Sequence, residues 1–168
     1  MDVILDTNYL AEYLKQYFNP DLANRGDGIF QANDLISPDL ARSLNSIMIL
    51  SGDGISNLVI ASTFAFIELA RNWESLAEGM FTVDQLHAFV YEPPPWFSIA
   101  PVDYDLLPYF IDVPTVVVVN SKLEAVEWTD AVHMATVISR GLLPTDATMA
   151  TSDVRLKGIL RVHKRLIF

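Results

Sequence analysis

Short apolar runs alternate along the chain with longer stretches in which apolar residues recur at helical spacing. Four runs have the composition of buried strands, and they lie at positions 3–5, 58–61, 97–102 and 147–152. The helical spacing predicts helices over about 9–18, 38–50, 64–71, 74–90, 104–110 and 129–138. A last apolar run, at 159–162, predicts one more strand.

Residues that favour turns and helix ends separate these elements. Positions 19–34 are rich in Asn, Asp, Gly and Pro, which is typical of a loop. Ser37 is expected to cap the next helix, with Pro38 in its first position. Thr129 is expected to cap the helix that ends near Gly141.

Two segments stay open at this level. Gly79 offers a break within the 74–90 helix. In the segment 114–128, Val116 to Val119 have strand propensity, whereas Leu123, Val126 and Trp128 follow a helical spacing. The segment is therefore predicted as strand, helix or both.

The alternation of strands and helices predicts an α/β domain, with one parallel sheet, helices on its faces and right-handed crossovers. The chain shows no internal repeat and no interdomain linker, so residues 1–168 are expected to form a single domain. In such sheets, functional groups gather outside the carboxyl ends of the strands. Polar side chains that follow the strands are therefore expected to meet at one edge.

Four acidic residues stand in apolar sequence near the predicted strand ends and helix starts: Asp6, Glu68, Asp130 and Asp153. A buried carboxylate is costly unless it is protonated, paired with a cation or bound to a metal. No lysine or arginine is near enough in the sequence to be expected as a fixed partner of these acids. A shared divalent cation is the economical explanation, and it indicates a metal-dependent hydrolase.

Composition narrows the kind of metal. The chain has no cysteine and three scattered histidines, which excludes disulfides and thiolate zinc sites and leaves a poor set of zinc ligands. Oxygen ligands remain, and they favour Mg²⁺ or Mn²⁺. Although 51% of the residues are apolar, no uninterrupted stretch is long enough to cross a bilayer, and the chain begins with a strand-like run. We expect a soluble, cytoplasmic protein without a membrane partner.

The net charge of -10 opposes the binding of a polyanion, but the charge is unevenly distributed. All 21 acidic residues and six of the 11 basic ones lie within positions 1–154, which gives that part a charge of -15 and the last 14 residues a charge of +5. This basic tail is expected to be either a solvated terminal strand or a phosphate-binding strip. A bound cation would cancel part of the negative field nearby.

Each acid also has a purely structural interpretation. Asp6 could form a turn, Glu68 could lie on an exposed helix face, and Asp153 could cap the segment after its strand. Asp130 could simply favour a helix N-terminus, a contribution of only ~0.3–1 kcal/mol. The combination of the four favours a site. His133, one turn after Asp130, is expected to be packed or partly exposed rather than a ligand or base.

Four segments together resemble a known family. They are Val3–Asn8 (VILDTN), Ser62–Arg71 (STFAFIELAR), Trp128–Ala135 (WTDAVHMA) and Ala150–Asp153 (ATSD). In this order they resemble the PIN domain, a ribonuclease fold found in the toxins of VapB/VapC toxin–antitoxin pairs and in RNA-processing nucleases. The resemblance implies a three-layer α/β/α fold with a parallel sheet.

The resemblance also implies roles for individual residues. The acids that would bind the metal and take part in catalysis are Asp6, Glu68, Asp130 and Asp153. Asn8 and Thr151 would be polar support beside them. An RNA substrate, an antitoxin partner and a homodimer would follow, but residues 19–54 are expected to be an insertion relative to compact toxins. We therefore do not assign to this chain the dimer surface or the antitoxin groove of those toxins.

These expectations lead to a Mg²⁺- or Mn²⁺-dependent endoribonuclease, with a toxin as the favoured subclass. Candidate contacts for substrate phosphate are Arg71, Arg140, Arg155 and Lys157. One alternative is a catalytically silent PIN-like module that binds a protein partner through residues 19–54 and the exposed aromatics Tyr17, Phe18 and Phe30. The other is a structure-specific DNA nuclease.

Overall fold

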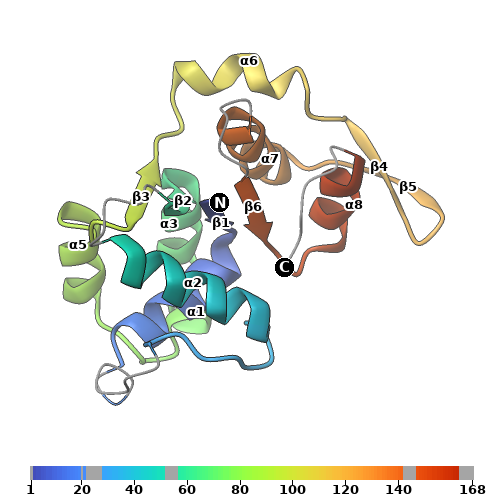
Figure 1. Ribbon diagram of the computed structural model, residues 1–168. Coiled ribbons are helices and arrows are strands. Elements are labelled where there is room, and N and C mark those ends of the chain that lie inside the picture. Colours follow the sequence, from blue (N-terminus) through green and yellow to red (C-terminus); the bar gives the residue numbers. More distant parts are fainter. Residues whose placement is uncertain (1, 20, 22–27, 52–56, 142–146, 163–168) are drawn as a thin grey trace.

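The centre of the fold is a four-stranded parallel sheet in the order β3-β2-β1-β6 (Figure 1). A computed structural model describes residues 2–19, 21, 28–51, 57–141 and 147–162. The strands of the sheet are β1 (Asp2–Leu5), β2 (Val59–Ser62), β3 (Phe97–Ala100) and β6 (Ala147–Ala150). Strand β1 is central, since Leu5 is paired with Ala61 on one side and with Ala150 on the other.

Alternation along β1 divides the buried residues into two cores. Val3 and Leu5 belong to a core shared with five helices, whereas Ile4 belongs to the core on the other side of the sheet. The first layer contains α1 (Thr7–Tyr17), α2 (Pro38–Leu50), α3 (Thr63–Arg71), α4 (Trp73–Ala77) and α5 (Val83–Tyr91). The second contains the 3₁₀ helix η2 (Tyr104–Leu106), α6 (Leu107–Phe110), α7 (Trp128–Gly141), α8 (Val154–Val162) and the strands β4 (Val116–Val119) and β5 (Lys122–Ala125). The predicted α/β class with a three-layer α/β/α architecture is confirmed.

Local signals in the sequence place several helix ends correctly. The Ser37 hydroxyl accepts a hydrogen bond from the Leu40 amide at 3.2 Å, and Pro38 is the first residue of α2. The 74–90 region divides into α4 and α5, where Glu78 and Gly79 have φ angles of 51° and 70°. The break expected at Gly79 is therefore confirmed.

The open segment 114–128 forms the β4–β5 hairpin. Asn120 and Ser121 connect the strands with φ angles of 49° and 65°. Two-residue hairpins with a type I′ turn need positive φ angles at both turn positions, and Asn tolerates this conformation well. The hairpin is held against α8, where a Cβ atom on Gly158 would lie 2.8 Å from Val117 Cγ2.

One predicted strand and one predicted helix cap are wrong. The strand expected at 159–162 belongs to helix α8, in which Leu156 and Ile159 are buried one turn apart. Arg155 and Lys157 therefore lie on a helix rather than on a solvated terminal strand. Thr129 does not cap α7, because the helix already begins at Trp128 and the Ala131 amide donates to the Glu127 carbonyl at 3.0 Å.

The region expected to be an insertion contributes to the main core. Phe30 is 2% exposed, and Leu40 and Leu44 of α2 are also fully buried. Tyr17 and Phe18 are half-buried and pack against this core. The expectation of an exposed aromatic is therefore wrong for Phe30, and Tyr17 and Phe18 are only partly exposed because they pack against the core.

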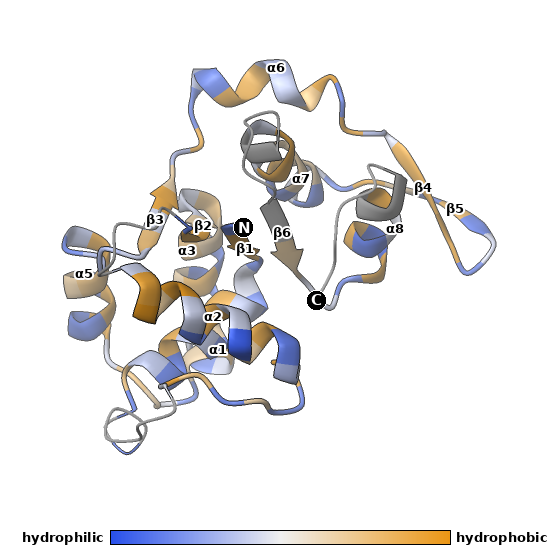
Figure 2. Cartoon of the chain, in the orientation of Figure 1, coloured by the Kyte–Doolittle hydropathy of each residue, from blue (hydrophilic) through white to orange (hydrophobic). Residues whose placement is uncertain are grey.

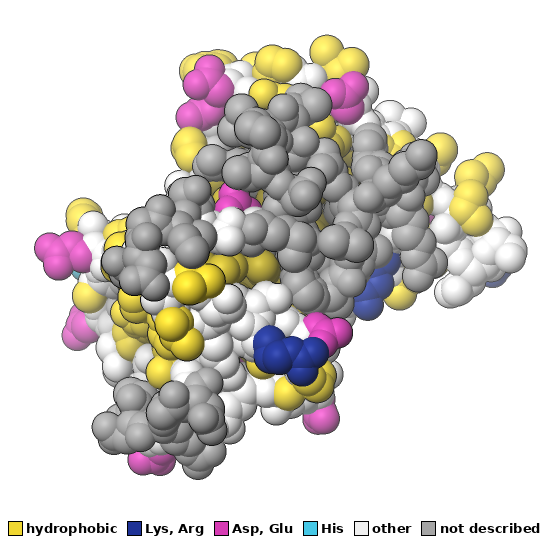
Figure 3. Space-filling view, viewed as in Figure 1, with side chains coloured by type: hydrophobic (Ala, Val, Ile, Leu, Met, Phe, Trp, Pro, Cys, Tyr) yellow, Lys and Arg dark blue, Asp and Glu magenta, His cyan; other side chains and the backbone are white. Residues whose placement is uncertain are grey.

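Large exposed apolar side chains occur on both layers, for example Ile67 of α3 and Tyr91 of α5 on the first layer. Figures 2 and 3 show hydrophobic residues along α6 and the β4–β5 hairpin, which extends from the edge of the molecule. Ile111 and Leu123 are 86% and 75% exposed. Within the described ranges, none of the helices combines the length and apolar character needed to span a membrane.

Candidate functional site

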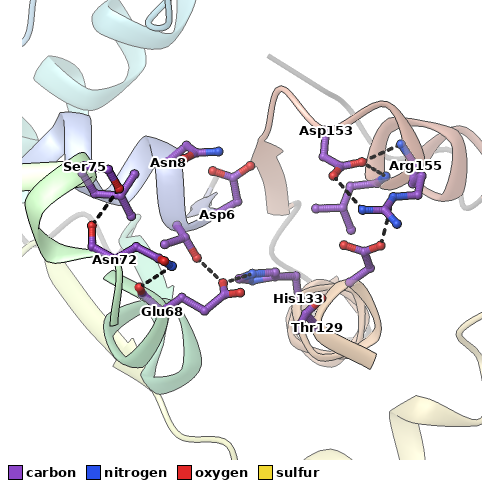
Figure 4. A pocket seen from close by; sticks show the side chains of 13 residues that line it. Asp6, Asn8, Glu68, Asn72, Ser75, Thr129, His133, Asp153 and Arg155 are labelled. Carbon is purple, nitrogen blue, oxygen red and sulfur yellow. Dashed lines mark hydrogen bonds and ion pairs between the residues drawn. The ribbon is translucent and has the colours of Figure 1, made fainter. Parts of the chain in front are cut away.

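An open pocket of about 360 Å³ lies beyond the carboxyl ends of β1 and β6 (Figure 4). All four acids singled out in the sequence line this pocket. Asp6 directly follows β1, Glu68 lies in the second turn of α3, Asp130 lies in the first turn of α7, and Asp153 directly precedes α8. The structure thus brings together side chains from four separate elements, while their catalytic and metal-binding roles stay predictions.

Asp6 is buried at the start of α1, with 5% of its surface exposed. Its Oδ1 accepts a hydrogen bond from the Tyr9 amide at 3.0 Å, so the side chain caps the helix. Burial raises the pKa of Asp6, although hydrogen bonds from the Thr151 hydroxyl and the Tyr9 amide oppose the rise. Thr151 is thus a polar neighbour of Asp6, as expected. The exposed Asn8 side chain lines the same pocket.

Glu68 is held by two polar neighbours. The Thr7 hydroxyl donates to its Oε2, and His133 Nε2 lies 3.3 Å from the same oxygen. Burial alone would raise the pKa of Glu68, but the hydrogen bonds from His133 and Thr7 and the charge of His133 outweigh it and lower the pKa. The environment of Glu68 therefore favours its ionised form.

His133 is packed, as expected, but it also contacts a site residue, which the sequence interpretation missed. Its side chain is 7% exposed, and its ring lies edge-on to Phe64 at a centroid distance of 5.7 Å. The available signal was its spacing from Asp130, because residues three apart on a helix share a face. Its contact with Glu68 joins α7 to α3 and could not be read from that spacing.

Asp130 is the least satisfied of the four acids. The residue is 6% exposed, and its buried Oδ2 accepts no hydrogen bond. Among the described residues, no other buried side-chain oxygen or nitrogen lacks a hydrogen bond. Burial raises the pKa of Asp130; the charge of Arg155 opposes this rise, and the charges of Asp153 and Glu127 add to it. A buried carboxylate oxygen without a hydrogen bond is costly unless it is protonated or compensated by a cation.

Arg155 corrects the expectation that these acids have no fixed basic partner. Its guanidinium contacts Glu127 Oε1 at 2.6 Å, Asp130 Oδ2 at 3.5 Å and Asp153 Oδ2 at 3.6 Å. The first turn of α8 brings Arg155 beside Asp153, and the packing of α8 on α7 brings it to Asp130 and Glu127. The pairing was missed because a strand was expected where α8 runs.

Two other candidate phosphate contacts, Arg71 and Lys157, do not line this pocket. Arg71 is exposed in the last turn of α3 and lines a neighbouring hollow that shares Asn72 and Ser75 with it. Lys157 is half-buried on α8 and does not line the pocket. The side chain of Arg140 lies outside the described residues.

The contacts divide the pocket into two halves. Asp6 contacts Thr151, Glu68 contacts Thr7 and His133, and Asp130 and Asp153 share Arg155. Figure 4 shows Glu68 beside His133 and, apart from them, Asp153 beside Arg155. Among the described residues, no group of three or more His, Asp or Glu side chains is arranged so that it could hold a metal ion. The four carboxylates and the unbonded Asp130 oxygen nevertheless fit a hard divalent cation by donor chemistry. The guanidinium of Arg155 lies beside two of these candidate metal ligands, Asp130 and Asp153.

Comparison with known proteins gives one similar fold. No protein-family model matches the chain, and no curated protein matches it. The chain is similar to one in the crystal structure of VapBC2 from Rickettsia felis bound to a DNA fragment from their promoter. The TM-score is 0.51 and the sequence identity 15%, with 100% of this chain and 98% of the other covered. The likeness supports a PIN-like three-layer fold and leaves the chemistry to be argued from the site.

Proposed function

We propose that this protein is a divalent-metal-dependent endoribonuclease, and that it acts as the toxin of a toxin–antitoxin pair. The observation that carries the proposal is the meeting of four carboxylates, from four separate elements, in one pocket at the carboxyl edge of the sheet. Ionised carboxylates that line one pocket repel one another, and a hard cation is a partner that can compensate them. By analogy with other proteins of PIN-like fold, RNA is favoured as the substrate.

The four acids would hold Mg²⁺ or Mn²⁺. When bound, the cation would supply Lewis acidity toward the phosphodiester and acidify a water molecule. Thr7 and His133 fix the Glu68 carboxylate, and Thr151 fixes that of Asp6, so that these two groups are oriented before any ligand arrives. This side of the pocket is therefore preorganised.

The negative pocket also sets how RNA would bind. An acidic pocket repels phosphate until a cation cancels part of its field. Asn8 is exposed at the pocket and can donate to a phosphate or ribose oxygen, and Arg71 lies at the rim of the neighbouring hollow. We therefore infer that RNA binding depends on prior metal binding.

An antitoxin partner and a homodimer belong to the same proposal. Their support is the similar fold of a chain in the VapBC2 complex. Co-expression with the product of a neighbouring gene, followed by purification through a tag on this chain, tests the partner. A monomer that copurifies with no other protein would contradict this part of the proposal.

The second candidate is a catalytically silent binding module. It is favoured by the absence, among the described residues, of a preassembled group of three metal ligands and by the pairing of Asp130 and Asp153 with Arg155. A silent module would bind no Mn²⁺ at millimolar concentration in a calorimetric titration.

A cleavage panel tests the leading proposal. Purified protein is incubated with single-stranded RNA, structured RNA and single-stranded DNA, each with Mn²⁺ and with chelator. We expect cleavage of RNA with Mn²⁺ and none with chelator. Preferential cleavage of DNA, or cutting that persists in chelator, would contradict the proposal.

A further inference from the structure

We propose that Arg155 is a built-in counter-cation that competes with a divalent metal ion for Asp130 and Asp153. The inference rests on the proposed function, since it requires these acids to belong to a metal site. It adds that the metal-free site already contains a positive group from the chain itself. Arg155 would then be a positioning residue that sets how tightly the metal binds.

The contact distances show where Arg155 is anchored. The guanidinium makes its shortest contact, 2.6 Å, with Glu127, which is exposed and is not one of the four pocket acids. Its distances to Asp130 and Asp153 are 3.5 and 3.6 Å, and neither contact is a hydrogen bond. The side chain is thus held firmly at one end and only electrostatically at the end that faces the site acids.

Asp130 and Asp153 present the atoms that a metal would use. Asp130 Oδ2 is buried and accepts no hydrogen bond, although Arg155 Nε lies beside it. Asp153 Oδ1 accepts hydrogen bonds from the Arg155 and Leu156 amides at 2.7 and 3.3 Å, so that Oδ2 is the oxygen turned toward the guanidinium. Both Oδ2 atoms face the Arg155 guanidinium and neither accepts a hydrogen bond from it. A divalent ion would interact with these two oxygens more strongly.

Arg155 has a route out of the site. Its side chain is 27% exposed, whereas the helix that carries it is fixed by the buried Leu156 and Ile159. An arginine side chain can turn toward solvent while its helix stays in place. Metal binding then requires the guanidinium to leave Asp130 and Asp153, with the exposed Glu127 side chain either following it or losing its hydrogen bond, and no movement of α8.

The test compares Mn²⁺ binding by the full chain with that of Arg155→Met in calorimetric titrations at neutral pH. Removing the competing charge is expected to tighten Mn²⁺ binding about tenfold. The metal-free variant is expected to melt at a lower temperature than the parent, because Asp130, Asp153 and Glu127 then repel one another without compensation. Arg42→Met is the matched control, since it removes the same charge from an exposed ion pair with Asp39 on α2. Its Mn²⁺ affinity should equal that of the parent.

The outcomes separate the inference from the proposed function. Tighter binding by Arg155→Met, or binding by that variant alone, supports the competition. Equal or weaker binding by the variant, with clear binding by the parent, overturns the role of Arg155 and leaves the metal site standing. No binding by either protein overturns both.

A second measurement follows metal binding in the unmodified protein, and a conservative variant serves only to assign one signal. The Nε–H signal of Arg155 is followed by NMR during a Mg²⁺ titration and is assigned by its absence from Arg155→Lys. Release of the guanidinium is expected to shift this signal in step with metal binding, while the Arg42 signal stays in place. An Arg155 signal that does not move at saturating Mg²⁺ would overturn the inference.

Discussion

Each acid in the pocket meets a different environment, and this environment sets its charge. Burial raises the pKa of Asp6 and of Asp130, whereas hydrogen bonds from His133 and Thr7 overcome burial and lower the pKa of Glu68. Groups with opposed pKa shifts in one pocket are typical of functional sites. Substitutions of Asp6 and Asp130 can therefore remove a candidate metal ligand without lowering the stability of the metal-free fold.

Replacing Asp6 by Asn and by Ala is expected to have different effects on stability. Asn is as good a helix cap as Asp and carries no charge to bury, so Asp6→Asn should keep or raise the free energy of unfolding at neutral pH. Asp6→Ala removes the acceptor of the Tyr9 amide and should cost about 1 kcal/mol. Urea denaturation with chelator present measures both. Equal losses in the two variants would show that the cap is not what Asp6 contributes.

Asp130→Asn is expected to stabilise the metal-free protein at neutral pH. The pKa of Asp130 in the fold lies above its ordinary value of 3.8, so its favourable, protonated form is lost as pH rises through the folded pKa. The variant should be more stable than the parent at pH ~7, and the gain should shrink as the pH falls toward ~4. Urea denaturation across this range, with chelator, measures it. A gain that does not change with pH would contradict the raised pKa.

The sequence predicted which acids meet in the pocket but not their partners. Asp6 and Asp153 follow strands directly, and parallel strands place such residues at one edge. Arg155 was seen only as a possible phosphate contact, because its contacts with Asp130 and Glu127 join residues far apart in the sequence. Such contacts depend on how α7 and α8 pack, and no local pattern specifies them.

At the scale of elements, the β4–β5 hairpin and helix α8 are the segments whose secondary structure the local sequence pattern did not predict. The 114–128 segment mixed two periodicities, and the turn residues Asn120 and Ser121 were the signal for a hairpin. At 159–162 the apolar run was short enough to fit either a strand or a helix. Extending the pattern back to Leu156 gives the helical spacing that the structure shows.

Ser121→Gly is expected to stabilise the protein through this hairpin. Ser121 has a φ angle of 65°, and glycine adopts this conformation without steric cost. The free energy of unfolding should rise by about 0.5–1 kcal/mol in thermal or urea denaturation. Ser43→Gly, within helix α2, is the matched control and should lower it by about 0.5–1 kcal/mol. A loss of stability in Ser121→Gly would contradict the turn.

At the scale of the whole molecule, the alternation of strands and helices predicted the parallel sheet and its two helical layers. The strand order β3-β2-β1-β6 was beyond local patterns, because it depends on which strands pair across the chain. The negative charge is concentrated before position 155, and the four acids add to it at the pocket. A cation in the pocket is therefore the condition for binding a polyanion such as RNA.

The central claim is that the pocket acids support metal-dependent cleavage of RNA. The most direct test is the rate of Mn²⁺-dependent RNA cleavage by the parent and by Asp6→Asn, with folding of both checked by denaturation. We predict that the parent cleaves RNA and that Asp6→Asn is slower by roughly a hundredfold or more, because it lacks one ionised ligand. Equal rates in the two proteins would contradict the assignment of the site.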